Sequence, residues 1–316
     1  MRLHFYKYQG AGNDFVLIDN RVGEVEYTEK IVGYLCDRRF GVGADGLMLL
    51  QKSSIADFEM VYFNSDGKQA SMCGNGGRCI VAFAKYLGVI DTETTFEAYD
   101  GMHDAVVLES DGQNNIVKLK MNVSASIREC LNGWYIDTGS PHYIEFVDNI
   151  YAVDVKQEGC KLRNDVAFAP HGTNVDFVKM KGNNDIEVAT YERGVEDETL
   201  SCGTGVTAAA LISAHLKSSE ILVNKINVKT KGGNFSVFFD KNNDGEYENI
   251  YLQGPATPTT IGGQAFGPAS LTAVKTAFLT PSIPSAGFSM KTRLIFSLPN
   301  PFGASVSLIL SPATIL

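Results

Sequence analysis

The strongest constraint on the fold of this chain is that its two halves contain similar elements in the same order. An asparagine followed by a short strand-like pattern occurs at residues 12–16 (GNDFV) and again at residues 173–178 (TNVDFV). Each pattern is followed by further strand-like segments, then by a Cys-Gly-x-Gly string and an apolar run at helical spacing, at Cys73 and at Cys202. The shared order favours a duplicated architecture, which predicts two similar domains with a small-molecule site in the cleft between them.

Both Cys-Gly-x-Gly strings place a thiol at the start of a helix. The first backbone N–H groups of a helix have no intrahelical partner, and the helix dipole favours negative charge there. We therefore expect these helix starts to lower a thiol pKa from its ordinary value of about 8.5 and to create a usable base or nucleophile. A buried cysteine can also be a small core residue, but two such sites indicate a pair that acts on one substrate.

Composition excludes several classes of protein. The chain has 316 residues, a formal charge of −9 and six cysteines, which argue for two domains and against a nucleic-acid-binding surface or a disulfide scaffold. The N-terminal residues are too polar for a secretory signal, no apolar run could span a bilayer, and the histidines lack metal-ligand spacing. We expect a cytoplasmic protein without a metal ion. Among the other cysteines, Cys36 and Cys79 are expected in the core, whereas Cys130 and Cys160 have no supporting pattern.

Most segments before residue 256 read as strands, because they are rich in β-branched and aromatic residues and are separated by Gly, Asn and Asp. The expected strands are 3–8, 15–19, 47–51, 58–64, 105–109, 116–121, 134–137, 143–147, 175–180, 186–191, 226–230, 235–239 and 250–252. Three helices are expected, one capped by Thr28, one after Cys73 that ends near Gly88, and one after Cys202.

The last part of the chain differs sharply from the rest. All 36 acidic residues precede residue 256, whereas seven of the ten prolines follow it. We expect domains at residues 1–122 and 123–255, followed at 256–316 by an atypical, acid-free, Pro-rich tail that is disordered and arises from a frameshift or fusion. Reading the coding DNA in the other frames tests this origin. Truncation after Pro255 is expected to leave thermal stability nearly unchanged.

A pair of opposed thiols suits the inversion of a carbon that bears hydrogen. A thiolate on one face removes the proton while a thiol on the other face donates one, and helix N-termini stabilise the charge that forms beside a carboxylate. The glycine-rich string at residues 41–46 lacks the features of a phosphate-binding loop and reads as a turn. Nothing in the sequence points to a lysine that would hold pyridoxal phosphate.

Seven short strings together resemble the diaminopimelate epimerase family, and they occur in the family's order up to about residue 255. The strings are GAGNDF (10–15), FNSDG (63–67), CGNGGRC (73–79), GSPH (139–142), GTN (172–174), YERG (191–194) and CGTG (202–205). The resemblance implies an α+β fold of two similar mixed α/β domains, each a largely antiparallel sheet or barrel around a central helix. It also implies a cofactor-independent isomerase, with its active site in the interdomain cleft, that converts LL-diaminopimelate to meso-diaminopimelate for lysine and peptidoglycan synthesis, and a homodimer.

The same resemblance implies roles for individual residues. Cys73 and Cys202 are the acid/base pair, and His142 and Glu192 tune the acidity of the thiols. The implied substrate-binding residues are Asn13, Asn64, Gly74, Asn75, Asn174, Glu192, Arg193, Gly203 and Thr204. Their chemistry suits a substrate with two ammonium and two carboxylate groups, because Arg193 can hold a carboxylate bidentately and Glu192 can hold an ammonium.

The chain also departs from the family pattern. Gly46 stands where some members have Gln, and Ser140 replaces a common Asn. After residues 250–255, where the family has a short strand that returns to the first domain, this chain has Thr257, Pro258 and two further threonines. If that strand is missing, an edge of the first domain is left unpaired.

Three other functions remain open from the sequence. The first is another two-cysteine racemase on the same fold, such as a proline or hydroxyproline type, although Glu192 and Arg193 supply a second clamp that such substrates do not need. The second is a thiol–disulfide redox pair, although Cys73 and Cys202 lie far apart and lack the Cys-x-x-Cys arrangement. The third is a binding protein of duplicated architecture that does not exchange the α-hydrogen of its ligand.

Overall fold

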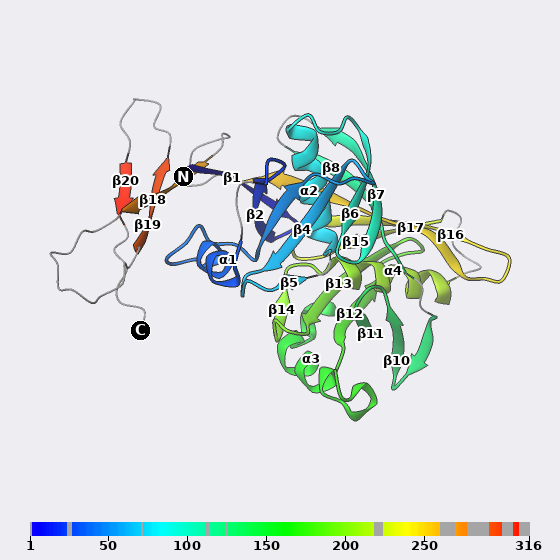
Figure 1. Cartoon of the computed structure of the whole chain (residues 1–316). Coiled ribbons are helices and arrows are strands. Elements are labelled where there is room, and N and C mark those ends of the chain that lie inside the picture. The colour runs from blue at the N-terminus through cyan, green and yellow to red at the C-terminus, as the bar shows by residue number, and fades with distance from the viewer. Residues whose placement is uncertain are drawn as a thin grey trace.

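The computed structural model describes residues 2–23, 27–70, 72–110, 114–123, 126–217, 224–259, 269–276, 291–298 and 306–309. Eight strands close into a barrel in the first half, in a ring in which each pairs with the next and the last pairs with the first (Figure 1). In ring order they are β1 (Arg2–Gly10), β2 (Asn13–Asp19), β3 (Gly46–Gln51), β4 (Phe58–Asn64), β6 (Glu93–Ala98), β7 (Gly101–Ser110), β8 (Asn115–Lys120) and β17 (Tyr247–Pro258). Closure of the ring leaves these strands without a free edge.

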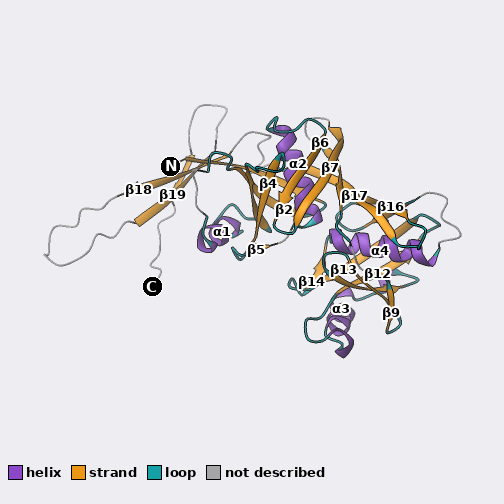
Figure 2. Ribbon diagram, turned by 45° about the vertical axis from the view of Figure 1, so that its right-hand side comes forward, coloured by secondary structure: helices purple, strands orange, loops and turns teal. Residues whose placement is uncertain are grey.

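The second half wraps a similar sheet around its own helix, and we call this sheet the second barrel, although its pairings among the described residues do not close into a ring. Its strands are β9 (Arg128–Cys130), β10 (Gly133–Asp137), β11 (Pro141–Phe146), β12 (Asn174–Met180), β13 (Asp185–Glu192), β14 (Asp197–Thr199), β15 (Lys225–Lys229), β16 (Asn234–Lys241) and the shared β17. The remaining short elements are β5 (Gln69–Ala70), α1 (Glu29–Cys36), η1 (Ile150–Ala152), α3 (Val155–Arg163) and η2 (Val166–Phe168). The central helices are α2 (Gly74–Tyr86) and α4 (Gly203–Leu216), each of which lies among the strands of its own half (Figure 2).

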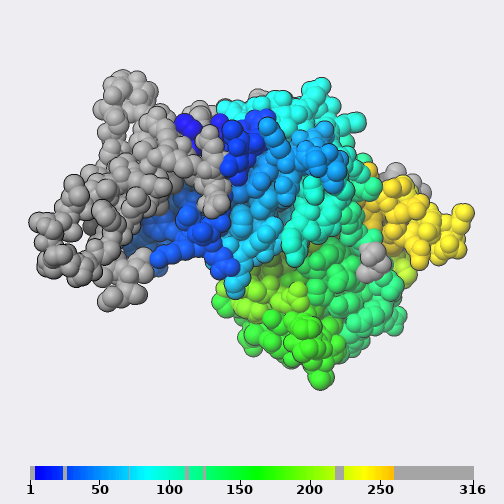
Figure 3. Space-filling model, viewed as in Figure 1, coloured from blue at the N-terminus to red at the C-terminus, as the bar shows by residue number. Residues whose placement is uncertain are grey.

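The strand pairings repeat between the halves. The series β1-β2-β3-β4-β6-β7-β8 pairs antiparallel, parallel, antiparallel, parallel, antiparallel and antiparallel. The series β10-β11-β12-β13-β15-β16-β17 has the same six pairings in the same order. The last strands of the two series, β8 and β17, pair with each other, so the halves join edge to edge. The expected fold of two similar mixed α/β domains is confirmed, and the two bodies are visible in Figure 3.

The central helices are buried on nearly all sides, which explains why their sequences are apolar around most of their circumference. On α2, Ile80, Val81 and Phe83 have no exposed surface, and neither have Leu211 and Ile212 on α4. Each such side chain stabilises the fold by about 1.5–3 kcal/mol on burial. The barrels therefore hold the two helices, and the loops that precede them, in fixed positions.

The expected helix ends agree with the structure. The Thr28 hydroxyl accepts a hydrogen bond from the Ile31 N–H at 3.3 Å, and Gly88 follows α2 with φ of +69°. Cys36 and Cys79 are buried, as expected. Helix α3 and strand β6 were not expected, because the sequence of α3 is mostly polar and that of β6 begins with polar Glu and Thr residues.

The structure corrects two expectations for the start of the tail. Strand β17 continues to Pro258 and pairs with β1, and the Thr259 N–H donates to the Lys7 carbonyl oxygen at 2.9 Å. The returning edge of the first domain is therefore paired, because a proline is tolerated at the end of a strand. Ala256 is fully buried, so truncation after Pro255 removes a core residue.

Further strands lie in the range expected to be disordered. They are β18 (Ala269–Thr276), β19 (Lys291–Leu298) and β20 (Val306–Ile309). Strand β18 pairs antiparallel with Arg2–Phe5 of β1, and β19 pairs with β18 and β20. β-Branched residues at every second position of residues 271–276 (LTAVKT) give a reason for β18. The frameshift origin of the tail stays a prediction, and its other residues lie outside the described ones.

Candidate active site

The two halves meet at the starts of their central helices. Cys73 and Cys202 are the N-cap residues of α2 and α4, and both have extended backbone conformations. A Cβ atom on Gly203 would lie 3.2 Å from the Cα of Gly74, so the first turns of the two helices touch through glycines. This contact brings both thiols and the free N–H groups of both helix starts to one place.

Cys73 is half-buried, and its surroundings oppose its ionisation. Its Sγ accepts a hydrogen bond from the Gly76 N–H at 3.2 Å. Burial raises the pKa of the Cys73 thiol to about 12, and the negative charges of Glu192 and Cys202 add to this effect. The Gly76 N–H and Arg78 act in the opposite direction without overcoming burial. The expectation that the helix start lowers the thiol pKa is therefore wrong for Cys73, because desolvation outweighs the N–H groups.

Cys202 has different neighbours. Its Sγ lies 3.3 Å from Oγ1 of Thr204, and the other side of that hydroxyl lies 2.9 Å from Nε2 of His142. Nδ1 of His142 lies 2.6 Å from Oδ2 of Asp176, and the Thr190 hydroxyl donates to the second oxygen of Asp176 at 2.6 Å. A row of hydrogen-bonded side chains thus leads from the interior of the second barrel to the Cys202 sulfur.

The charge state of His142 follows from its partner. Burial disfavours the imidazolium, but the charge and hydrogen bond of Asp176, together with Cys202, raise the pKa of His142 to about 10. His142 and Asp176 both have no exposed surface, so the pair is screened little by water. The raised pKa favours the imidazolium form of His142 beside the Asp176 carboxylate.

On the Cys73 side, a buried arginine fixes the amide of Asn75. Arg78 donates to Oδ1 of Asn75 at 2.9 Å, to the Gly74 carbonyl at 3.0 Å and to the Pro255 carbonyl at 3.2 Å. The Asn75 amide nitrogen in turn donates to the side-chain oxygen of Asn13. Arg78 has no exposed surface, and burial lowers its pKa to about 10. Arg78, near the start of α2, therefore sets the orientation of Asn75 and, through it, of Asn13.

Asn13 is also held from its other side by an acidic pair. Its amide nitrogen donates to Asp45 at 3.2 Å, and Arg38 binds both Asp45 and Asp14 at 2.6 Å. Asn64 is exposed at the end of β4, and the next residue, Ser65, donates its N–H to the Asp45 carbonyl at 3.0 Å. Asn13 and Asn64 therefore both border the Asp45 loop.

The second half supplies the charged residues that are expected to bind the substrate. Asn174 accepts a hydrogen bond from the Arg193 N–H at 2.8 Å and donates to the Pro141 carbonyl at 3.0 Å. Burial raises the pKa of Glu192. The guanidinium of Arg193 lies 3.4 Å from two backbone carbonyl oxygens and is half-buried. The expected binding residues of this half thus surround the end of β13.

The sequence profile of the diaminopimelate epimerase family matches residues 5–123 and 134–258. The chain belongs to this family. The diaminopimelate epimerase of Flavobacterium psychrophilum is 46% identical over 255 residues, which cover 80% of this chain and 97% of that protein. The enzyme of the same name from Chlorobaculum tepidum is 43% identical and is covered to 95%. The matched segments contain every residue of the site described above.

Solved structures of lower identity share the fold. A Bacillus anthracis phenazine biosynthesis protein of the PhzF family superposes with a TM-score of 0.66 at 13% identity, over 82% of this chain and 98% of that one. A probable proline racemase from Agrobacterium radiobacter gives a TM-score of 0.55 at 16% identity, over 83% of this chain and 93% of that one. These likenesses concern the architecture alone.

Two departures from the family pattern can now be placed. A Cβ on Gly46 would lie 2.5 Å from a ring carbon of Tyr62, so a side chain there requires Tyr62 to move. Ser140 is half-buried, and its carbonyl oxygen accepts the Thr138 N–H at 3.1 Å. Neither position contacts a thiol through a hydrogen bond in the part of the chain that the structure describes.

Sequence reasoning missed the residues that support the site from behind, namely Arg78, Asp45, Asp176 and Thr190. Two of them carried a signal. Arg78 is a charged residue at the start of an apolar helix, and Asp176 interrupts the apolar strand Asn-Val-Asp-Phe-Val. A charged residue in a pattern that predicts full burial indicates a buried polar network.

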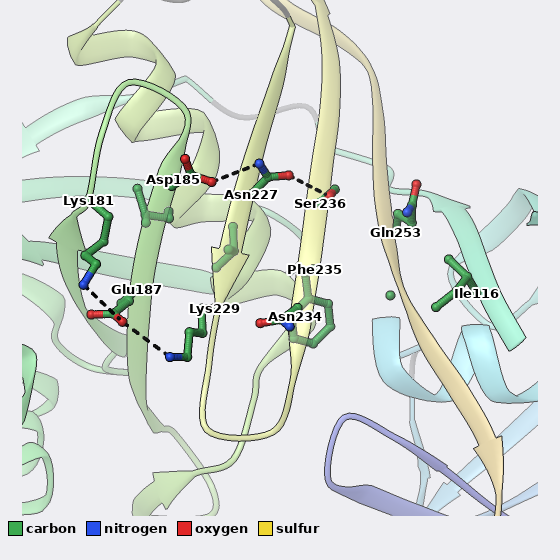
Figure 4. A pocket seen from close by; sticks show the side chains of 13 residues that line it. Ile116, Lys181, Asp185, Glu187, Asn227, Lys229, Asn234, Phe235, Ser236 and Gln253 are labelled. Atoms are coloured by element: carbon green, nitrogen blue, oxygen red, sulfur yellow. Dashed lines mark hydrogen bonds and ion pairs between the residues drawn. The ribbon is translucent and has the colours of Figure 1, made fainter. Parts of the chain in front are cut away.

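The molecule also has a groove whose lining does not include the residues of the site. A groove of about 520 Å³ lies over β13, β15, β16 and β17 (Figure 4). Within it Glu187 lies 3.7 Å from Lys181 and 3.8 Å from Lys229. Among the described residues, no group of three or more His, Cys, Asp or Glu is arranged to hold a metal ion. None of the described helices is long and apolar enough to cross a membrane.

Proposed function

We propose that this protein epimerises LL-diaminopimelate to meso-diaminopimelate with Cys73 and Cys202 as its acid/base pair. The observation that carries the proposal is the contact between Gly74 and Gly203, which joins two helix starts that each bear a thiol. Membership of the diaminopimelate epimerase family supports the choice of substrate.

The chemistry needs no oxidant and no cofactor. The thiolate of one cysteine takes the α-hydrogen as a proton, and the electron pair of the C–H bond moves into the adjacent carboxylate. The thiol of the other cysteine then donates its proton to the opposite face of the same carbon. The N–H groups of Gly74, Asn75, Gly203 and Thr204 lie in the first turns of α2 and α4, where a helix supplies no partner, and would hold the carboxylate while its charge increases. The two cysteines exchange protonation states in each turnover.

The other end of the substrate selects the stereoisomer in this proposal. Arg193 binds the distal carboxylate, Glu192 binds the distal ammonium, and Asn13, Asn64 and Asn174 supply amide contacts. A distal centre of the wrong configuration would leave a charged group unpaired in a partly buried site, which is costly. His142 and Glu192 would tune the acidity of the thiols, since each contributes charge next to one of them.

We also infer that the protein is cytoplasmic and forms a homodimer, with a small molecule and neither nucleic acid nor a membrane as its partner. Six cysteines without a disulfide pattern support the cytoplasmic location. A net charge of −9 supports the inference that neither nucleic acid nor a membrane is a partner. Size-exclusion chromatography with light scattering tests the dimer, and a monomeric mass would contradict it.

Exchange of the α-hydrogen with solvent deuterium tests the proposed activity. We expect deuterium to enter one α-carbon of diaminopimelate together with interconversion of the LL and meso forms, followed by mass spectrometry and chiral chromatography. Binding without exchange would indicate a non-catalytic binding protein. Exchange with proline or hydroxyproline instead of diaminopimelate would indicate the alternative racemase. Activity that needs a Cys73–Cys202 disulfide would indicate a redox protein.

A further inference from the structure

The interior of the second barrel contains a buried ion pair that the proposed reaction does not by itself require. Asp176 lies on β12 and His142 on the adjacent parallel strand β11, and neither has exposed surface. Thr190, opposite Asp176 on β13, is 3% exposed and donates its hydroxyl to the carboxylate. Burial of an ion pair costs desolvation free energy that the attraction between the charges often fails to recover. A role in stability alone therefore does not explain this pair.

The position of the ion pair suggests a function. With Asp176 accepting at Nδ1, a protonated His142 presents its Nε2–H to the Thr204 oxygen at 2.9 Å. The amide nitrogen of Asn174 also faces this Nε2, at 3.3 Å, and donates to the Pro141 carbonyl oxygen. The Thr204 hydroxyl is then left to donate its own hydrogen to the Cys202 sulfur, 3.3 Å away. A donor aimed at the sulfur, backed by a positive charge, stabilises a thiolate.

We propose that Asp176 is a positioning residue that acts through His142 and Thr204, so that Cys202 and not Cys73 carries the thiolate of the free enzyme. Asp176 touches neither the thiol nor the reacting carbon. It sets the orientation and charge of His142, and the relay delivers the effect to the sulfur. The assignment deepens the proposed function, because it names the thiol that removes the proton first.

The surroundings of Cys73 support the same assignment. The sulfur accepts the Gly76 N–H, and the charged or titratable groups around it are Glu192 from β13, Arg78 from α2, Tyr62 from β4 and Cys202. Glu192 and a Cys202 thiolate both oppose a second negative charge at this position, so Cys73 stays a thiol that is ready to donate.

The first turn of α4 leaves room for the ion pair. A Cβ atom on Gly205 would collide with Oδ1 of Asp176 and would lie 3.1 Å from Cε1 of His142. Glycine at this position therefore lets the helix start approach the carboxylate closely. The relay also extends to the helix backbone, because the Thr138 hydroxyl donates to the Thr204 carbonyl at 2.9 Å. Thr204 is thus fixed from three sides.

Alkylation of the full-length protein without substrate tests the proposal. The two cysteines are followed separately by peptide mass spectrometry while iodoacetamide reacts across a pH series, since only the thiolate displaces iodide. The pH midpoint of each reaction is compared, because rates alone also reflect access. We expect Cys202 to become reactive at lower pH than Cys73. Asp176→Asn should move the Cys202 midpoint upward by about one pH unit, a tenfold loss of thiolate below the midpoint, and leave Cys73 unmoved.

Three variants keep this test decisive. Thr204→Val removes the donor and should act like Asp176→Asn even if the latter folds poorly, whereas Thr204→Ser should restore the midpoint. Asp185→Asn is the matched control, because Asp185 accepts from Asn227 at 3.0 Å in the groove of Figure 4 and should change neither midpoint. The proposal is overturned if Cys73 reacts at lower pH, or if Asp176→Asn and Thr204→Val leave Cys202 unmoved. Because no substrate is present, these outcomes are separate from failure of the epimerase activity.

Discussion

Cys73 and Cys202 occupy equivalent positions in two barrels with the same strand order, yet their supporting residues differ in chemistry. Behind Cys73, the buried cation Arg78 donates to neutral oxygens of Gly74, Asn75 and Pro255. Behind Cys202, the buried imidazole of His142 is paired with the buried carboxylate of Asp176, which favours its protonated form. The first arrangement orients amides, and the second holds a donor next to a sulfur.

This difference teaches how a duplicated fold can serve an asymmetric task. Repetition of the fold supplies two helix starts that face each other, which a two-sided proton transfer needs. Identical surroundings would give both thiols the same proton affinity, and the free enzyme would then have no fixed base. Substitutions in the first helical turn and on β12 separate the two roles without changing the barrels. The following predictions break or sharpen this contrast, from the largest expected effect to the smallest.

The proposed charged clamp, Arg193 and Glu192, belongs to the second half. It should contribute more to substrate binding than the amide side chains of the first half. Arg193→Met is expected to raise KM for diaminopimelate about 10–100-fold, because a charge-assisted hydrogen bond contributes about 1.5–3 kcal/mol. Asn64→Ala, which removes a neutral contact, should raise KM only about 2–10-fold. Steady-state kinetics measure both, and Arg21→Met on the surface serves as the control. Equal effects of Arg193→Met and Asn64→Ala would contradict the proposed clamp.

Equivalent glycines in the two helices should respond differently to alanine. Gly205→Ala forces a methyl group against the Asp176 carboxylate and is expected to destabilise the fold by about 1–3 kcal/mol. Gly76→Ala meets the terminal methyl group of Met48, which can move, so the gain in helix propensity should offset much of the cost. Each kcal/mol corresponds to about 2–4 °C in Tm for a chain of this size class. Equal melting temperatures for the two variants would show that the ion pair is not rigidly held.

The end of β17 should contribute more to thermal stability than the sequence alone indicates. Truncation after Pro255 removes the buried Ala256 and the pairing of Thr257 and Pro258 with β1, so we expect it to melt lower than a chain truncated after Thr259. A loss of about 1–2 kcal/mol would lower Tm by about 2–8 °C. Differential scanning calorimetry of the two truncated chains measures this difference. Coincident transitions would support the earlier expectation that nothing after Pro255 contributes.

The ion pair also predicts a pH dependence of stability. The pKa of His142 in the folded protein, about 10, lies above the ordinary histidine value of about 6.5. The protonated imidazole therefore contributes its full stabilisation below a pH of about 6.5, and this contribution is lost as pH rises towards about 10. We expect Tm of the unmodified protein to fall more steeply over this range than Tm of His142→Gln. Parallel slopes would mean that His142 does not titrate as the geometry requires.

Much of the fold could be predicted from the sequence, because strand alternation and the two Cys-Gly-x-Gly helices are local signals. The central helices and the duplication followed from them, and so did both cysteines of the site. Helix α3 did not, since a polar surface helix lacks a clear apolar stripe. The pairing of Pro258 with β1 depends on where two distant strands meet, which no local pattern contains.

The supporting residues of the site were harder to foresee for a related reason. The pKa of Cys73 depends on the balance between a helix start and desolvation of the half-buried thiol, and only the three-dimensional structure shows that desolvation dominates. Arg78 and Asp176 could have been recognised as charges in buried patterns, but their partners come from other elements of the chain. Sequence therefore located the two thiols that we propose as the reacting groups, whereas the structure was needed to show what surrounds them.

Single-cysteine variants test the central claim, that two thiols act on opposite faces of one carbon. Cys73→Ala and Cys202→Ala are incubated separately with LL- and meso-diaminopimelate in deuterium oxide, and both inversion and α-deuteration are measured. We expect each variant to lose inversion by about 10²–10⁴-fold, with any residual deuteration confined to one stereoisomer and opposite between the two variants. Inversion near the original rate in either variant would contradict the account, because a single thiol would then be sufficient.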